Sequence, residues 1–142
     1  MTKIDGGGRR ILVVDDDLAI RVLLEAVLKR MGFDVMVASD GRSALELNER
    51  YDYDLILLDL LMPIMNGYEV LARIPVRKKP HVIVFSGVEE NGADSIPREK
   101  VCKSIRKPFD LELFTTSVAD CLEQNHSLPE ESPSVRSASE RT

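Results

Sequence analysis

Four groups of side chains in this 142-residue chain could do chemistry together, because each comes after an apolar run, the last of which, at 101–105, is weaker. They are the acidic triplet Asp15 to Asp17, then Asp59, then Ser86, and finally Lys107 before a proline. Carboxylates that converge repel one another, so they predict a hard cation, and Mg²⁺ prefers one or two carboxylates with water and phosphate oxygens. A carboxylate can attack phosphorus to give an acyl phosphate, whose oxygens a cation, a hydroxyl and an ammonium would neutralise. These residue types favour an aspartyl-phosphate site.

The segments that must position these groups alternate between two hydrophobic periods. Apolar runs typical of buried strands alternate with segments whose apolar residues repeat at helical spacing. We expect strands at 11–14, 34–38, 55–58, 82–85 and 101–105, and helices at about 18–31, 41–51, 66–74 and 110–124. Between 89 and 100, Gly92 and Pro97 disfavour a long regular helix.

This alternation predicts an α/β fold with helices on both faces of one parallel sheet. Five strand–helix units suit the flavodoxin-like doubly wound five-stranded sheet, in the order 2-1-3-4-5. In such a sheet, ligands bind at the carboxyl ends of the strands. The acidic, hydroxyl and lysine side chains are therefore expected on one rim.

The composition sets the limits of the folded body and of the partners. We expect a flexible leader at 1–8, a folded domain at 9–124 and a disordered Ser/Pro/Glu tail at 125–142. A net charge of -5 lacks the basic balance of a nucleic-acid binder, so no direct nucleic-acid contact is expected. We see neither a membrane span nor an export signal, and we therefore expect a cytoplasmic protein without membrane insertion. Cys102 and Cys121 are accordingly expected to be reduced and buried.

Four segments of the chain resemble motifs of response-regulator receiver domains, the phosphoacceptor domains of two-component signalling, often called CheY-like. ILVVDDD at 11–17 resembles the acidic end of the family's first strand. YDLILLDLLMPIMNGYEV at 53–70 resembles the phosphoacceptor strand and the loop after it. IVFSG at 83–87 and RKPF at 106–109 resemble the hydroxyl strand and the Lys-Pro turn. The likeness covers essentially all of 9–124, with the motifs in the family's order.

The resemblance implies a role for each site residue. Asp59 would be the phosphorylated nucleophile, and Ser86 and Lys107 would contact the phosphoryl oxygens. The implied ligands of Mg²⁺ are Asp16 directly, Asp15 in support, Asp59, and the backbone carbonyl of Leu61.

The implied function is that of a stand-alone receiver. A sensor histidine kinase, a phosphotransfer protein or a small phosphodonor would supply the phosphoryl group, and the modified domain would switch its contacts with an unknown downstream protein. The resemblance is also compatible with a homodimer of the receiver. Such a domain catalyses only its own phosphorylation and dephosphorylation, so it is not an enzyme that turns over a substrate.

Two departures from the family pattern concern the output face. The family usually has Tyr or Phe three residues before the lysine, where this chain has Ser104. The Pro97 segment also replaces the usual helix before the last strand. We therefore predict intact phosphorylation chemistry with an atypical output face.

Three other functions were weighed against this one. A receiver-like docking module that works without phosphorylation has the missing aromatic in its favour. A haloacid-dehalogenase-type phosphatase would use Asp15 and Asp17 as an Asp-x-Asp motif after the first strand, but Ser86-Gly87-Val88 supplies no acidic pair after the later strand. A flavodoxin-like cofactor protein would need a phosphate loop where this chain has acids.

Overall fold

A computed structural model of the chain describes residues 7–62, 65–74, 80–87 and 100–124. In chain order its elements are β1 (Arg10–Val14), α1 (Leu18–Arg30), β2 (Asp34–Ala38), α2 (Gly41–Arg50), β3 (Leu55–Asp59), α3 (Gly67–Arg73), β4 (His81–Ser86), β5 (Lys103–Arg106) and α4 (Leu111–Gln124). The five strands form one sheet in the order β2-β1-β3-β4-β5, and every neighbouring pair is parallel. The predicted doubly wound flavodoxin-like fold is confirmed.

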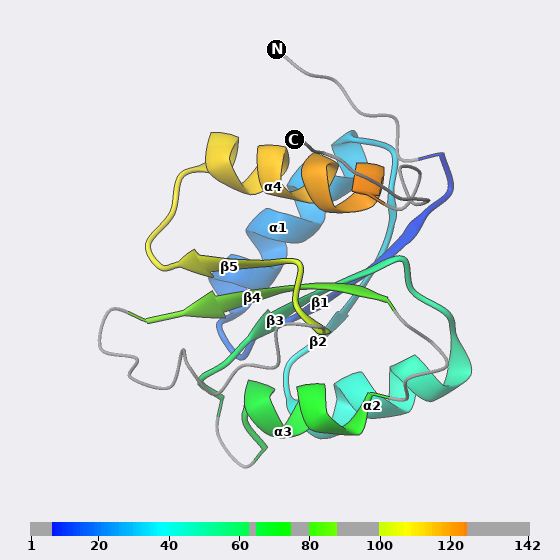
Figure 1. Ribbon diagram of the computed structural model, residues 1–142, viewed down its shortest axis with the longest axis vertical. Helices are drawn as coiled ribbons and strands as arrows, with labels where there is room; N and C mark the ends of the chain where they lie inside the picture. The colour runs from blue at the N-terminus through cyan, green and yellow to red at the C-terminus, as the bar shows by residue number, and fades with distance from the viewer. Residues whose placement is uncertain (1–6, 63–64, 75–79, 88–99, 125–142) are drawn as a thin grey trace, which may run out of the picture.

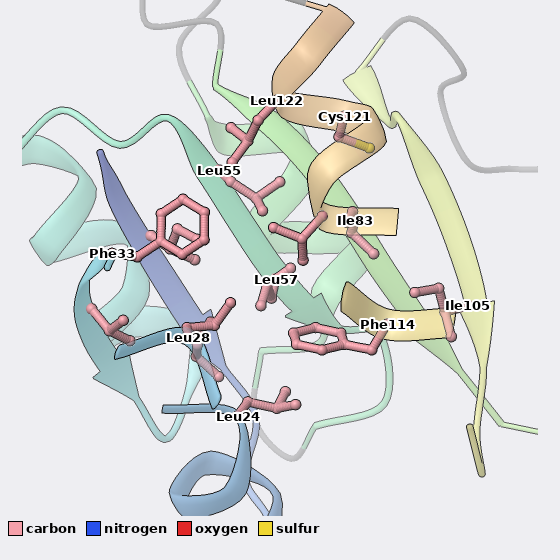
Figure 2. Packing of buried hydrophobic residues seen from close by; sticks show 14 of the residues in the cluster. Leu24, Leu28, Phe33, Leu55, Leu57, Ile83, Ile105, Phe114, Cys121 and Leu122 are labelled. Atoms are coloured by element: carbon pink, nitrogen blue, oxygen red, sulfur yellow. The ribbon is translucent and has the colours of Figure 1, made fainter. Parts of the chain in front are cut away.

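The helices cover the sheet on both faces, with α1 and α4 on one side and α2 and α3 on the other (Figure 1). Side chains alternate across the central strands, because successive residues of a strand point to opposite faces. On β3, Leu55 and Leu57 belong to the core under α1 and α4, while Ile56 and Leu58 belong to the core over α2 and α3. Figure 2 shows the first of these layers, in which Phe114 of α4 lies beside Leu57.

Local signals fix where the helices begin and end. The Asp17 carboxylate accepts from the N–H of Ala19 at 2.9 Å and caps α1, and Gly32, with a φ of 94°, follows the end of that helix. Asn66 and Glu69 form a capping box at the start of α3. These caps hold the loops that leave β1 and β3.

Gly67 lets α3 start directly against the end of β3. A Cβ at this position would lie 2.5 Å from the backbone oxygen of Asp59 and 2.7 Å from the Cα of Leu60. No larger side chain fits there without moving the backbone. The glycine therefore sets how closely the loop after Asp59 folds back on the strand.

The prediction of reduced cysteines is wrong. Cys102, just before β5, and Cys121, in α4, form a disulfide with their Cα atoms 6.1 Å apart. β5 and α4 bring the two residues within the span that a disulfide can bridge. The sequence argument used only the missing export signal and could not see this proximity.

Some sequence predictions fall outside the described residues. The leader (apart from Gly7 and Gly8), the segment around Gly92 and Pro97, and the tail lie there, so these predictions stay predictions. Among the residues that the structure describes, no helix is long and apolar enough to cross a membrane.

Candidate functional site

The carboxyl ends of four strands bring the predicted side chains to one rim. Asp15 follows β1, Asp59 ends β3, Ser86 ends β4 and Lys107 follows β5. Asp15, Asp16 and Asp59 can each offer one carboxylate oxygen, and these oxygens lie within 4.8 Å of one another. The acidic cluster expected from the sequence is therefore present.

Asp15 is buried, with 1% of its surface exposed, and both of its carboxylate oxygens are engaged. Oδ1 accepts from the N–H of Asp17 at 2.9 Å, and Oδ2 accepts from Nζ of Lys107 at 2.8 Å. Its backbone carbonyl accepts from Nη1 of Arg21 at 2.8 Å. Asp15 is thus held from three directions, whereas Asp16 beside it is exposed.

Lys107 lies between the two buried acids. Its Nζ is 2.8 Å from Oδ2 of Asp15 and 3.5 Å from Oδ2 of Asp59. Burial alone would lower the pKa of Lys107, but its hydrogen bond to Asp15 and the charge of Asp59 outweigh that effect and raise it. The lysine is therefore a charged ammonium that compensates both carboxylates.

Asp59 has an environment that disfavours its charge. Burial, and then the nearby charge of Asp15, raise the pKa of Asp59 to about 6, although Lys107 and the N–H of Leu61 act in the opposite direction. That N–H donates to Oδ1 of Asp59 at 3.2 Å. At neutral pH the carboxylate is still mostly ionised, which a nucleophile toward phosphorus requires.

Ser86 and Leu61 border the same rim. Ser86 is half-buried at the end of β4, and its backbone carbonyl accepts from the N–H of Lys107 at 2.8 Å. The Leu61 side chain is exposed, and a Cβ on Gly87 would lie 3.6 Å from its Cδ1. Leu61, two residues after Asp59, thus lies next to the end of β4.

The donor set fits a hard divalent cation. It consists of carboxylate oxygens, one of them on an exposed residue, Asp16, that leaves room for water ligands. Asp15, Asp16 and Asp59 would hold such an ion, and Lys107 occupies one oxygen of Asp15.

Two features of the site were missed by the sequence analysis. Arg21 lies one turn into α1 after the N-cap, and this position alone could have suggested that it reaches back to the rim. Below the lysine, the Phe85 ring stacks on Phe109 with 5.0 Å between centroids, and Phe114 completes a trio. Nζ of Lys107 is 6.0 Å from the centroid of Phe85, so this trio supports the ammonium from the core side.

Comparison with known proteins identifies the family. The sequence model described as "Response regulator receiver domain" matches residues 11–119. The chain belongs to this family. Receiver domains are signalling domains of two-component systems rather than classical enzymes, and phosphorylation on aspartate is typical of them. Membership therefore argues against the phosphatase and flavodoxin-like cofactor alternatives.

The chain is similar to a curated response regulator in sequence and to a solved receiver domain in structure. The cell cycle response regulator CtrA of Brucella ovis is 41% identical over 80 residues, which are 56% of this chain and 34% of CtrA. The chain thus matches about a third of the length of the curated relatives. The signal receiver domain of an HD domain-containing protein from Pseudomonas fluorescens superposes with a TM-score of 0.77 at 26% identity, covering 85% of this chain and 99% of that one.

A further structural neighbour was solved with Mg²⁺ and BeF bound. It is the response regulator TrrA of Thermotoga maritima in complex with Mg²⁺ and BeF, with a TM-score of 0.72 and 30% identity over 80% of this receiver and 99% of TrrA.

Proposed function

We propose that this receiver accepts a phosphoryl group on Asp59 in a Mg²⁺-dependent transfer. The donor is a sensor histidine kinase, a phosphotransfer protein or a small phosphodonor. The observation that carries the proposal is the placement of Lys107 between Asp15 and Asp59, with Nζ 2.8 Å and 3.5 Å from their oxygens. This arrangement supplies a nucleophile, a compensating cation and an acidic pocket at one rim.

Each side chain has a distinct task in the proposed transfer. Oδ2 of the ionised Asp59 carboxylate attacks phosphorus, and the bond from phosphorus to the donor breaks. The donor's histidine nitrogen, or the acetate of acetyl phosphate, leaves with that electron pair, while the N–H of Leu61 orients Oδ1 of Asp59. Lys107 already lies close to Oδ2 of Asp59, so it can contact an oxygen of a phosphoryl group whose phosphorus is bonded to Oδ2. Ser86 contacts a second oxygen of that group. Bound Mg²⁺ supplies further neutralisation of charge on the phosphoryl oxygens.

The proposed metal ligands are the three carboxylates and one backbone group. Asp16 would coordinate the ion directly, Asp15 and Asp59 would supply carboxylate oxygens, and the carbonyl of Leu61 would complete the protein ligands. The exposure of Asp16 supports its direct role, because an accessible carboxylate can take up an ion without unfolding the loop. TrrA, whose structure holds Mg²⁺ and BeF, gives this assignment support from a similar fold.

The domain is proposed to act at 9–124 as a cytoplasmic regulator that also hydrolyses its own acyl phosphate. Its output would be a switched contact with a downstream protein. Ser104, at the position of the family's aromatic switch, is exposed on β5, so the output face would differ from the common pattern.

The experiment that tests phosphorylation is intact-mass spectrometry after incubation with Mg²⁺ and acetyl phosphate. We expect an adduct of about 80 Da that is lost in Asp59→Asn and upon removal of Mg²⁺. The alternative, a docking module that works without phosphorylation, predicts no adduct and no Mg²⁺-dependent response to beryllofluoride. That outcome would refute the proposal, and partners would then be sought by binding alone.

A further inference from the structure

The disulfide closes a loop around the last strand of the sheet. Cys102 immediately precedes β5 and Cys121 lies near the end of α4, 19 residues further along the chain. The closed loop contains all of β5, the turn at Lys107 and most of α4. The bond therefore joins the start of β5 to the helix that covers it.

Other contacts at this end of β5 are weak. β5 is an edge strand that pairs with β4 alone, and Ile105 is its one buried residue. Lys103 and Asp120 form an ion pair at 3.1 Å, but their side chains are 36% and 47% exposed. Exposed ion pairs of this kind contribute little stability. The covalent bond is thus the strongest link that the described residues provide between the start of β5 and α4.

The two cysteines differ in exposure. Cys121 is fully buried in the layer between the sheet and α4 (Figure 2), whereas Cys102 is partly exposed. Thiol–disulfide exchange requires a thiolate to reach one of the sulfurs, and exposed disulfides are the labile ones. Cys102 is therefore the cysteine of the pair that an incoming thiolate would approach in the folded protein.

We propose that the Cys102–Cys121 bond is a redox-responsive crosslink, which dithiol reductants open in the folded protein and whose opening loosens β5 from α4. One thiolate of the reductant attacks Sγ of Cys102 and expels the Cys121 thiolate, which takes up a proton. The second thiol of the reductant then displaces Cys102 as a thiolate, which is also protonated, and closes the reductant's own disulfide. Two electrons and two protons pass from the dithiol to the crosslink.

Loosening of β5 would affect both the exposed surface around Ser104 and the position of Lys107. Ser104, two residues after Cys102, is exposed on β5, and Lys107 leaves the far end of the same strand. The redox state of the crosslink would thus govern the order of the surface around Ser104. The proposal does not depend on phosphorylation of Asp59.

Hydrogen exchange followed by mass spectrometry tests this on the full chain. The oxidised protein is compared with protein treated with dithiothreitol without denaturant, and free thiols are counted by alkylation. We expect two thiols after treatment, and a rise in exchange at residues 102–106 that exceeds the rise in β1 and β3 by a factor on the order of ten. The N–H of Cys102, which donates to the carbonyl of Val82 at 2.7 Å, is a direct reporter.

Two variants separate the crosslink from its surroundings. In Cys102→Ala, residues 102–106 are expected to exchange as fast as in the reduced wild-type protein, whether or not dithiothreitol is present. Lys103→Met removes the neighbouring ion pair but keeps the disulfide, so its response to the reductant should persist. Because the wild-type comparison needs no substitution, it remains decisive even if a variant folds poorly.

Three results would overturn the proposal. The first is two free thiols in protein purified without reductant. The second is a disulfide that dithiothreitol reaches only after denaturation. The third is an exchange rate at 102–106 that does not change on reduction, or changes only in step with β1 and β3.

Discussion

Replacing Lys107 with methionine should destabilise the receiver in a pH-dependent way. The substitution keeps the length of the side chain but removes the ammonium that lies 2.8 Å from Asp15 and 3.5 Å from Asp59. Asp15 and Asp59 are 1% and 8% exposed at their side chains, so they would face each other as buried acids without a cation.

The size of the effect follows from this burial. Removing one partner of a buried ion pair costs about 3–5 kcal/mol. The Lys107 side chain is 26% exposed and water reaches it, so we expect the lower end, about 3 kcal/mol at pH 8. Loss of the ammonium also raises the pKa of Asp59 beyond its already raised value. At pH 5 Asp59 is then protonated, the repulsion is gone, and the loss should shrink to about 1 kcal/mol.

Urea unfolding at pH 5 and pH 8 measures this difference. Far-UV circular dichroism is the suitable signal, because the chain has no tryptophan. Lys103→Met is the matched control, since it removes a lysine whose partner Asp120 is 47% exposed, and its effect should stay below about 1 kcal/mol. A Lys107→Met loss that is equal at the two pH values, or no larger than that of the control, would refute the electrostatic argument.

Three further predictions follow from the same geometry. The pKa of Asp59 is about 6 in the folded protein against 3.8 in the unfolded chain. The folded state therefore binds more protons, and stability falls as the pH rises from about 4 to 6. Asp59→Asn should remove this pH dependence and raise the free energy of unfolding above pH 6 by up to about 3 kcal/mol, measured by urea titration. Arg21→Met frees the Asp15 carbonyl and should weaken Mg²⁺ binding about tenfold by calorimetry, while stability changes little. Gly67→Ala places a Cβ 2.5 Å from the Asp59 backbone and should lower the free energy of unfolding by about 2 kcal/mol, whereas Gly87→Ala, with 3.6 Å to its nearest neighbour, should not.

The sequence was sufficient for the architecture because the strands at the centre of the sheet are buried on both faces. Such strands read as unbroken apolar runs, as at 55–58, and the first polar residue after each run marks the rim. The order of the strands then followed from the alternation with helices. This is why the sequence alone predicts Asp15 and Asp59 on one edge. Lys107 follows a strand with a single buried residue, and its place rests on the weaker fifth run and the Lys-Pro motif.

Contacts that depend on tertiary packing could not be inferred in the same way. The hydrogen bond of Arg21 to the carbonyl of Asp15 and the stacking of Phe85 on Phe109 depend on how helices and loops settle on the sheet. The disulfide depends on the same packing, because 19 residues separate its cysteines and nothing in their spacing indicates that they meet. Hydrophobic periodicity predicts which face of a helix or strand a residue occupies, but it does not predict which distant residue that side chain contacts.

The contact between Asp15 and Lys107 also has a consequence for how the chain folds. It joins residues 92 positions apart, and its lysine follows β5, the last strand in the chain and an edge of the sheet. Contacts with large sequence separation form late, since the chain must first close the intervening loop. Until β5 docks, Asp15 disfavours the ionisation of Asp59 with no lysine to offset it. Competence to accept a phosphoryl group would therefore arise only once the whole sheet is assembled, so that modification reports a completed fold.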